Sequence, residues 1–455
     1  MNDEPHPRRA SSGAHPSDVN TDSKQVFEAL GEPEAWKGEP HRWSDAIAAY
    51  PAGPLPFLDT TALSEKCRIA GIAEDRIPLL TALADEITRD PHLRVLAWYL
   101  FWCVLVACDS TGDWDLPSLK PRLGNRDGLL YLLLALEYPG QLAEYHRTLG
   151  YPREVTADTA RKVAWEEAIH VTGAGVPGIS SDQYRWFNSY LLSPSARLGR
   201  FEYNLRDEWG EYYYIFRREA DGAVIALIGG DLQVGEDGLL LDEDAPPSTG
   251  WTTSWSKTEE AITAYPIHPN GRILRREVRL PRPEWKQVPA MTGPGQFDSE
   301  ARLEMHVPFG GGMDWDSVRE SLNRAEAFFR RYVPSKPIRL FSMTTWFMDP
   351  RVPEILGESS NPARFLRACY LVPDTPHSGL LSSLIFHRNV ATTPVDELPA
   401  RTSVQRVIIA FLKRGGVWQG GGMFILPEDL PHLREGLYRD RFAALSREFG
   451  LEGLR

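Results

Sequence analysis

The stretch that most constrains this chain covers residues 301–327, ARLEMHVPFGGGMDWDSVRESLNRAEA. Apolar and polar residues alternate from 303 to 307, which is the period of a strand with one buried face. The glycines at 310–312 then allow backbone conformations that a side chain forbids. Asp314 is placed to cap a helix that begins near Trp315 and carries an apolar stripe. A strand that leads through a glycine turn into a helix N-terminus can hold a phosphate, but it is also an ordinary strand–helix connection.

Composition limits the class of protein. The chain has 455 residues, of which 42% are hydrophobic and 25% charged, as in globular proteins with two or three domains. The formal net charge of −12 argues against a general nucleic-acid binder and against docking on an anionic membrane. The four cysteines form no CxxC pair, and none lies beside a histidine at metal-ligand spacing. We therefore expect reduced cysteines and no metal site.

Targeting signals are also missing from the sequence pattern. The N-terminal residues have no apolar core of the kind that a signal peptide needs. The longest apolar run, residues 95–108, is too short for a transmembrane helix and fits a buried core helix. We expect a cytoplasmic protein without a membrane partner.

The residue pattern divides the chain into three parts. Residues 1–22 are polar and rich in Ser, Pro and His, which predicts a disordered tail. Residues 23–192 show helical periodicity around a segment that is apolar on every face, which predicts an all-helical domain. Residues 193–455 begin with short aromatic and β-branched runs separated by turn residues, and helices follow, which predicts a mixed α/β domain.

Three local assignments in the last part bear on function. Asn361 begins a predicted helix that continues through Tyr370. Residues 380–387 are predicted as a strand. Residues 417–426 are predicted as a glycine-rich strand. Its glycines at 420–422 lack the lysine of a phosphate-binding loop, so we interpret them as a bulge or turn rather than a phosphate cradle.

In this order the parts resemble the GNAT acyltransferase superfamily, and a closer resemblance is to the bacterial GNAT-like C-terminal domain family. The motifs that carry the closer resemblance are ARLGRFEY, HPNGRI, PEW, MHVPFGGGMDWDSVRESLNRAEAFF, FSMTTWFMDPRVPEIL, ESSNPARF and LPARTSVQR. In that family a helical acyltransferase domain precedes the GNAT-like half, and together the two would cover nearly the whole chain. The resemblance implies an α+β fold, in which the helical domain is followed by a domain with a central, mostly antiparallel sheet.

The resemblance also implies that acyl-CoA is the co-substrate. In the superfamily the glycine loop and the helix after it hold the pyrophosphate of acyl-CoA. The matching loop positions here are Phe309, Gly310, Gly311, Gly312 and Met313. An Asn after the next strand contacts the pantetheine arm, and a Tyr on the following helix often protonates the leaving thiolate. The matching positions are Asn361 and Tyr370.

Acyl transfer to an amine needs a base and a group that polarises the thioester carbonyl. Glu304 and His306 fall on one face of the predicted strand, about 7 Å apart, and a histidine titrates near neutral pH. Some GNAT enzymes use a Glu on this strand as the base, so Glu304 and His306 are both candidates, although a plain polar strand face has the same pattern. Candidate donors near the thioester are Ser342, Thr344 and Thr345.

We therefore expect direct transfer of an acyl group from acyl-CoA to an amine or hydroxyl of a small acceptor, in a ternary complex. One alternative is a non-catalytic ligand-binding or sensing protein. It is favoured by Asp314 and Asp316, which place negative charge where a pyrophosphate would lie. The other is an enzyme of another class that uses the cleft between the halves, with His268 and His306 as metal ligands. The oligomeric state does not follow from the sequence.

Overall fold

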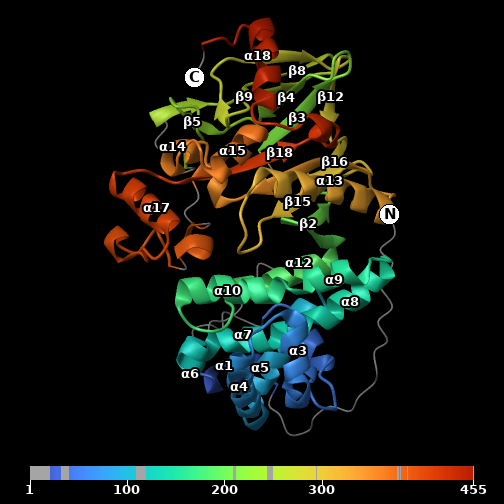
Figure 1. Cartoon of the computed structure of the whole chain (residues 1–455), viewed down its shortest axis with the longest axis vertical. Coiled ribbons are helices and arrows are strands. Elements are labelled where there is room, and N and C mark those ends of the chain that lie inside the picture. The colour runs from blue at the N-terminus through green and yellow to red at the C-terminus, as the bar shows by residue number, and fades with distance from the viewer. Residues whose placement is uncertain are drawn as a thin grey trace. The chain divides into compact units, whose positions relative to one another are not determined.

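The computed structural model describes residues 21–31, 40–108, 119–208, 212–242, 249–293, 295–376, 379, 381–386 and 388–453. The chain divides into two compact units, Met1–Pro194 and Ser195–Arg455, whereas the sequence pattern places a boundary between residues 192 and 193. The first unit runs from blue to green in Figure 1 and the second from green to red. Nearly all of the expected N-terminal tail lies outside the described residues.

The described part of the first unit is helical. Its α-helices are α1 Ser23–Ala29, α2 Trp43–Ala48, α3 Leu63–Ala70, α4 Ile77–Arg89, α5 Pro91–Phe101, α6 Lys120–Leu123, α7 Asp127–Ala135, α8 Tyr138–Thr148, α9 Arg153–Ala160, α10 Lys162–Ala174, α11 Ser181–Arg185 and α12 Ser189–Leu192. Helix α5 begins sharply because Asp90 accepts hydrogen bonds from the amides of His92 and Leu93 at 3.0 and 3.1 Å. Nearly all of α5 and α7 is buried in one apolar core, as the sequence predicts for its most apolar helix. Within the described residues, none of the helices has both the length and the apolarity needed to cross a membrane.

The second unit is built on a six-stranded sheet in the order β1-β2-β15-β16-β18-β17. The strands are β1 Ser195–Leu198, β2 Phe201–Arg206, β15 Ala301–His306, β16 Ile338–Thr344, β17 Tyr370–Pro376 and β18 Gln419–Ile425. The β15–β16 pairing is parallel and the other pairings in this sheet are antiparallel. The expected α+β fold with a mostly antiparallel sheet is therefore confirmed.

Smaller sheets complete the second unit. A five-stranded sheet has the order β10-β9-β4-β3-β12, and a three-stranded sheet the order β11-β8-β7. Their strands are β3 Tyr213–Arg218, β4 Val224–Ile228, β7 Trp255–Lys257, β8 Ala261–Ala264, β9 Pro266–His268, β10 Arg272–Ile273, β11 Val278–Pro281 and β12 Trp285–Val288. Two strand pairs are formed by β5 Gln233–Gly235 with β6 Gly250–Thr252 and by β13 Met291–Gly293 with β14 Gln296–Phe297.

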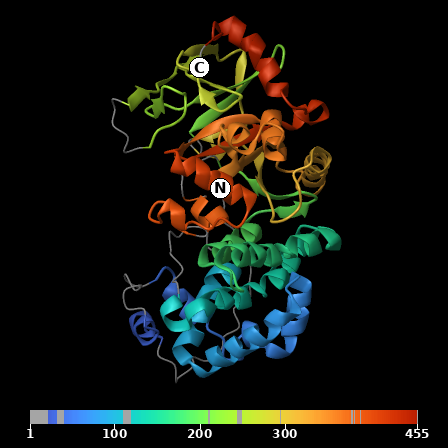
Figure 2. The ribbon, with the colours of Figure 1, turned by 60° about the vertical axis from the view of Figure 1, so that its left-hand side comes forward.

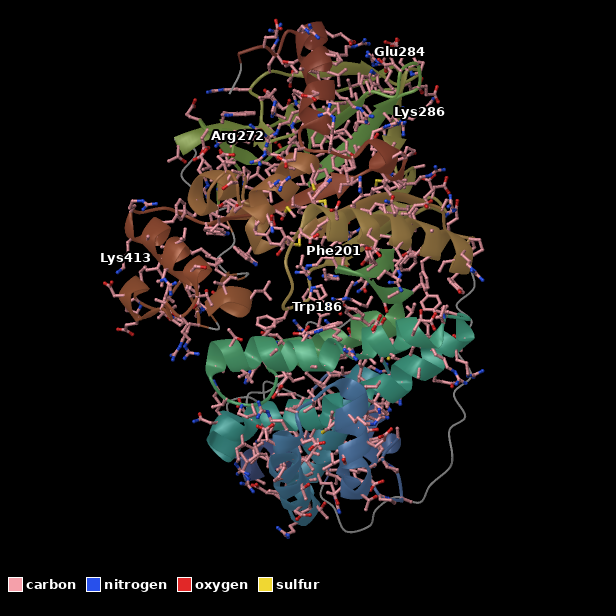
Figure 3. The ribbon with its side chains drawn as sticks, viewed as in Figure 1. Trp186, Phe201, Arg272, Glu284, Lys286 and Lys413 are labelled. Carbon is pink, nitrogen blue, oxygen red and sulfur yellow. The ribbon has the colours of Figure 1, made fainter. Side chains whose placement is uncertain are left out.

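The second unit also contains α-helices. They are α13 Trp315–Tyr332, α14 Val352–Leu356, α15 Asn361–Ala368, α17 Ser403–Lys413 and α18 Leu437–Phe449. Of these, α13, α15 and α18 contact strands of the sheets. The predicted apolar stripe of α13 is buried, and the helix contacts β1, β2 and β16. Phe201 of β2, labelled in Figure 3, packs against Phe365 of α15 with the ring centres 5.9 Å apart. Helix α18 lies beside the strands of the five-stranded sheet in Figures 1 and 2, and its Phe442 joins their apolar core.

Two local predictions are wrong. Helix α15 ends at Ala368, and Tyr370 begins β17, because a buried run that leads to Pro373 favours extended backbone over helix. The described residues of the predicted strand 380–387 form a π-helix, Leu381–Phe386, while residues 380 and 387 lie outside the described residues.

The glycines at 420–422 belong to β18 itself, in which every residue is buried. The predicted glycine-rich strand is therefore confirmed, and its pairing with β17 is irregular between Pro373 and Pro376, opposite Gly421 and Gln419. No turn forms at these glycines, and Gly421 is needed for space. A Cβ on Gly421 would overlap the carbonyl oxygen of Met348, so the glycine lets the 3₁₀ turn Trp346–Met348 lie directly against the strand.

Candidate functional site

Strand β15 carries the predicted base candidates on one face, and the register of the sheet adds polar neighbours. Glu304 and His306 alternate with the buried residues Leu303 and Met305, as the sequence pattern predicts. Strand β2 runs antiparallel beside β15 and places a polar residue opposite each polar residue of β15. The three pairs are Arg302 with Arg206, Glu304 with Asn204 and His306 with Glu202.

Glu304 is the centre of this polar cluster. Its Oε2 accepts a hydrogen bond from Nε of Arg206 at 3.0 Å and lies 3.6 Å from Nε2 of His306. Nη1 of Arg302 lies 3.9 Å from Glu304 Oε1. The side chains of Glu304 and His306 are 26% and 22% exposed, so both remain reachable by a ligand.

Arg302 connects the cluster to the neighbouring strand. This residue is buried, and its Nη1 donates a hydrogen bond to Oγ of Ser342 on β16 at 2.9 Å. Its Nε donates to the backbone oxygen of Glu208 at 3.1 Å. Ser342 of β16, one of the three predicted donors, therefore joins the cluster. The other two, Thr344 and Thr345, are exposed and half-buried.

These contacts decide the charge state of Glu304. Burial alone would raise the pKa of its carboxyl group. The interaction with His306 and the positive charges of Arg302 and Arg206 outweigh burial and hold the pKa of Glu304 well below its usual range. The carboxylate is therefore ionised at neutral pH.

The chain leaves β15 through the predicted glycine turn. Gly310 and Gly311 have φ angles of 78° and 72°, and a Cβ at either position would meet no atom within 4 Å. The backbone conformation, and not a lack of space, is therefore the reason for glycine there. Residues 309–312 are exposed, and Met313 is half-buried.

Helix α13 begins directly after this turn and has the predicted cap. Asp314 accepts hydrogen bonds from the Ser317 amide at 3.0 Å and from its Oγ at 2.7 Å. These bonds hold the pKa of the Asp314 carboxyl below its usual value. Asp316 is turned to solvent, with its side chain 90% exposed and 3.5 Å from Arg319. The two acids are thus engaged by a helix cap and by an ion pair.

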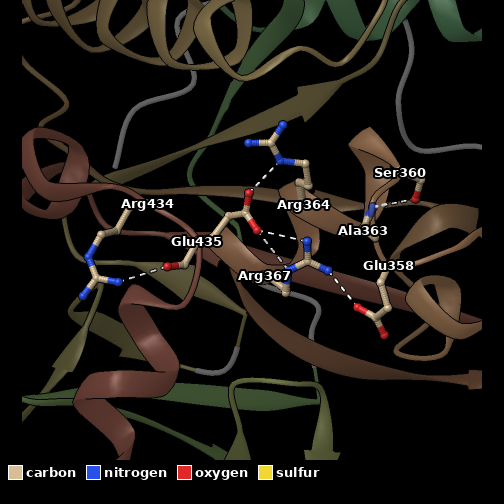
Figure 4. Close-up of polar contacts among 7 residues, drawn as sticks. All are labelled: Glu358, Ser360, Ala363, Arg364, Arg367, Arg434 and Glu435. Atoms are coloured by element: carbon tan, nitrogen blue, oxygen red, sulfur yellow. Dashed lines mark hydrogen bonds and ion pairs between the residues drawn. The ribbon is translucent and has the colours of Figure 1, made fainter.

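The other predicted site residues lie elsewhere in the second unit. Asn361 is exposed as the first residue of α15, whose N-terminus is capped by Ser360. Arg364 and Arg367 on the same helix both form ion pairs with Glu435, as Figure 4 shows.

Tyr370 is fully buried at the start of β17, whereas the base candidates Glu304 and His306 lie on β15. Its hydroxyl donates a hydrogen bond to the backbone oxygen of Ile267 at 2.5 Å and accepts one from the amide of Ala226 at 3.2 Å. Burial raises the pKa of Tyr370 far above its usual value. The hydroxyl thus ties β17 to β4 and β9, and this environment does not favour the expected role as an acid.

The structure gives no support to a metal held by His268 and His306. His268 lies in the five-stranded sheet, where its Nδ1 accepts a hydrogen bond from the Asn270 amide at 3.1 Å, and burial lowers its pKa. His306 ends β15 in the six-stranded sheet. In the described part of the chain, no group of three or more His, Cys, Asp or Glu residues could hold a metal ion.

Sequence reasoning missed Arg206, Arg302 and the buried Glu202 and Asn204. One signal was available, because polar residues alternate with apolar ones from 202 to 206 as they do in β15.

Two hollows of about 380 and 770 Å³ lie around β3 and β12, and they are lined by none of the predicted site residues.

Comparison with known proteins identifies both halves of the chain. Residues 196–424 match the family model described as GNAT-like C-terminal domain. Residues 61–191 match the model described as N-acyltransferase N-terminal domain. No curated protein sequence matches the chain.

Solved structures share the fold. One is an acyltransferase in complex with CoA and 10C-teicoplanin, with a TM-score of 0.56 and 20% identity over 89% of this chain and 98% of that chain. Another is an acyltransferase in complex with decanoyl-CoA and teicoplanin, with a TM-score of 0.55 and 20% identity over the same shares. A mutant acyltransferase in complex with octanoyl-CoA is similar at a TM-score of 0.56 and 20% identity, again over 89% of this chain and 98% of that chain.

Proposed function

This chain belongs to the GNAT-like C-terminal domain family, and from that premise we propose that it is an acyltransferase that takes its acyl group from acyl-CoA. The match of the first unit to an N-acyltransferase domain supports the reaction class. Structures of the same fold hold octanoyl-CoA or decanoyl-CoA, which supports the acyl donor. The observation that carries the proposal is that β15 bears a carboxylate–histidine pair and leads directly into a glycine turn at the start of α13.

In the proposed reaction the acceptor amine or hydroxyl attacks the thioester carbonyl within a ternary complex. His306 takes the proton that the attacking group loses, the new bond forms to the acyl carbon, and CoA leaves as a thiolate. Glu304 is held ionised by its neighbours, so it is a weak base. It is better suited to orient the His306 ring and to stabilise it after it has taken up the proton.

The glycine turn is the proposed site of the CoA pyrophosphate. The turn consists of residues that are exposed or half-buried and directly precede the capping residue of α13, namely Phe309, Gly310, Gly311, Gly312 and Met313. Backbone amides at such a position, together with the helix dipole, favour a bound anion. We propose that Asn361, exposed at the start of α15, contacts the pantetheine arm, and that Tyr370 has a structural role.

The acceptor is proposed to be a small molecule that bears an amine or a hydroxyl group. A structure with the same fold holds teicoplanin together with decanoyl-CoA, which supports an acceptor of small-molecule class.

Replacement of His306 tests the proposed base. We expect His306→Asn to lower kcat for CoA release from octanoyl-CoA, with a panel of amine acceptors, by roughly 10²- to 10⁴-fold. The matched control is His432→Asn, because His432 is exposed at the end of the 3₁₀ helix Pro427–His432. Unchanged turnover in the His306 variant contradicts the assignment of the base. A wild-type protein that binds acyl-CoA but never releases CoA supports the ligand-sensing alternative instead.

A further inference from the structure

One arginine outside the polar cluster reaches both ends of the glycine turn. Arg200 lies between β1 and β2, more than 100 residues before the turn in sequence. Its Nε donates a hydrogen bond to the backbone oxygen of Gly312 at 2.8 Å. Its Nη1 donates to the backbone oxygen of Pro308 at 3.1 Å. A single planar guanidinium group therefore bridges the two residues that flank the positive-φ glycines.

The hairpin that carries Arg200 is itself fixed to α13. Ser321 of α13 is fully buried, and its Oγ donates to the backbone oxygen of Leu198 and accepts from the Phe201 amide at 3.2 Å. Gly199 has a φ of 74°, and a Cβ there would lie 3.4 Å from the side chain of Ser321. The turn between β1 and β2 is thus held against α13. The backbone of Arg200, which lies in that turn, is therefore fixed relative to the helix.

The bridge determines which backbone groups the glycine turn presents. The carbonyl groups of Pro308 and Gly312 are occupied by Arg200. Among the described residues, no hydrogen bond from the amides of residues 309–313 to another part of the protein is found. The arrangement occupies acceptors of the turn and leaves its donors available, which is what an anion requires.

Arg200 also changes the charge beside the turn. Burial and the neighbouring Arg197 lower the pKa of Arg200 to about 10, while Asp314 acts in the opposite direction. The guanidinium is therefore positive at neutral pH. Its charge in turn helps to lower the pKa of Asp314, so the acid that caps α13 has a cationic neighbour.

We propose that Arg200 is a positioning residue for the acyl donor. It holds the turn from Pro308 to Gly312 in the shape in which the backbone amides face the pyrophosphate, and it offsets the negative charge of Asp314. This inference rests on the proposed function, because it assumes that the glycine turn binds CoA.

Calorimetric titration with CoA tests the inference on the full chain. We expect Arg200→Ala to raise the Kd for CoA by about tenfold to hundredfold, since two charge-assisted hydrogen bonds that shape the turn are lost. Arg200→Lys keeps the charge but lacks the planar fork, so it restores only part of the affinity. The matched control is Arg330→Ala, which removes an exposed positive charge from the last turn of α13, away from the glycine turn. Its Kd is expected to stay within about twofold of the wild-type value.

A kinetic measurement separates positioning from catalysis and from general damage. In Arg200→Ala, KM for acyl-CoA should rise while kcat at saturating acyl-CoA stays within about twofold of wild type, because the β15 cluster is untouched. Equal Kd values for CoA in wild type and Arg200→Ala overturn this inference and leave the proposed function standing. A wild-type Kd in Arg200→Lys also overturns it, because the positive charge of residue 200 would then explain the binding without the planar guanidinium. If the wild-type protein binds no CoA, the proposed function and this inference both fail.

Discussion

Replacing Glu304 by Gln removes one negative charge from the centre of the polar cluster and changes the shape of the side chain very little. The amide oxygen of Gln can still accept the hydrogen bond from Nε of Arg206, which is 3.0 Å long in the wild type. The attraction to His306 and to Arg302 is lost, because the Gln side chain is neutral. The perturbation is therefore electrostatic.

The sign of the effect follows from the pKa of Glu304. Its pKa is depressed in the folded protein, so the ionised carboxylate stabilises the fold at pH values above the ordinary glutamate pKa of about 4.3. This contribution is lost as the pH falls through the lower folded-state pKa. A hydrogen bond to a charged group contributes roughly 1.5–3 kcal/mol, and partial exposure reduces that value. With the Glu304 side chain 26% exposed, we expect Glu304→Gln to lower the free energy of unfolding by about 1.5 kcal/mol at pH 7.

Urea unfolding of the wild type and the variant between pH 7 and pH 3.5 measures this difference. We expect it to shrink below about pH 4.3, where the unfolded wild type takes up a proton. Glu320→Gln is the control, since Glu320 is exposed on α13 and the described residues provide no ion pair for it. A difference that stays the same over the whole pH range would refute the reasoning, because it would show that the charge of Glu304 is not involved.

Two further predictions concern buried residues of β18 and β17. Gly421→Ala should lower the free energy of unfolding by more than about 3 kcal/mol, because the new Cβ overlaps the Met348 carbonyl oxygen. Urea unfolding measures this loss. The control is Gly420→Ala, whose Cβ meets only the movable side chain of Asp374, so it should cost less than half as much. Tyr370→Phe should cost about 1–3 kcal/mol, since two buried backbone groups lose their partner, and should leave kcat unchanged; a variant with normal stability and a large loss of kcat would restore Tyr370 as the acid.

The sequence by itself determined the local architecture of the proposed acyl-CoA site. Alternating residues define β15, and the glycines at 310 and 311 adopt the positive φ angles that only glycine takes up easily. The side chain of Asp314 caps α13 at Trp315. These features depend on hydrogen bonds and dihedral angles within a few residues, so a local pattern is sufficient to predict them.

Only the tertiary structure decided which residues meet at this site. The register between β2 and β15 brings Arg206 to Glu304 across 98 positions of sequence, and Arg200 reaches the glycine turn across more than 100. Local preference also failed for Tyr370, because the buried hydroxyl finds its partners in another sheet. Strand register is set by how whole faces of the sheet bury their apolar side chains, and this depends on distant parts of the chain that no short window of sequence contains.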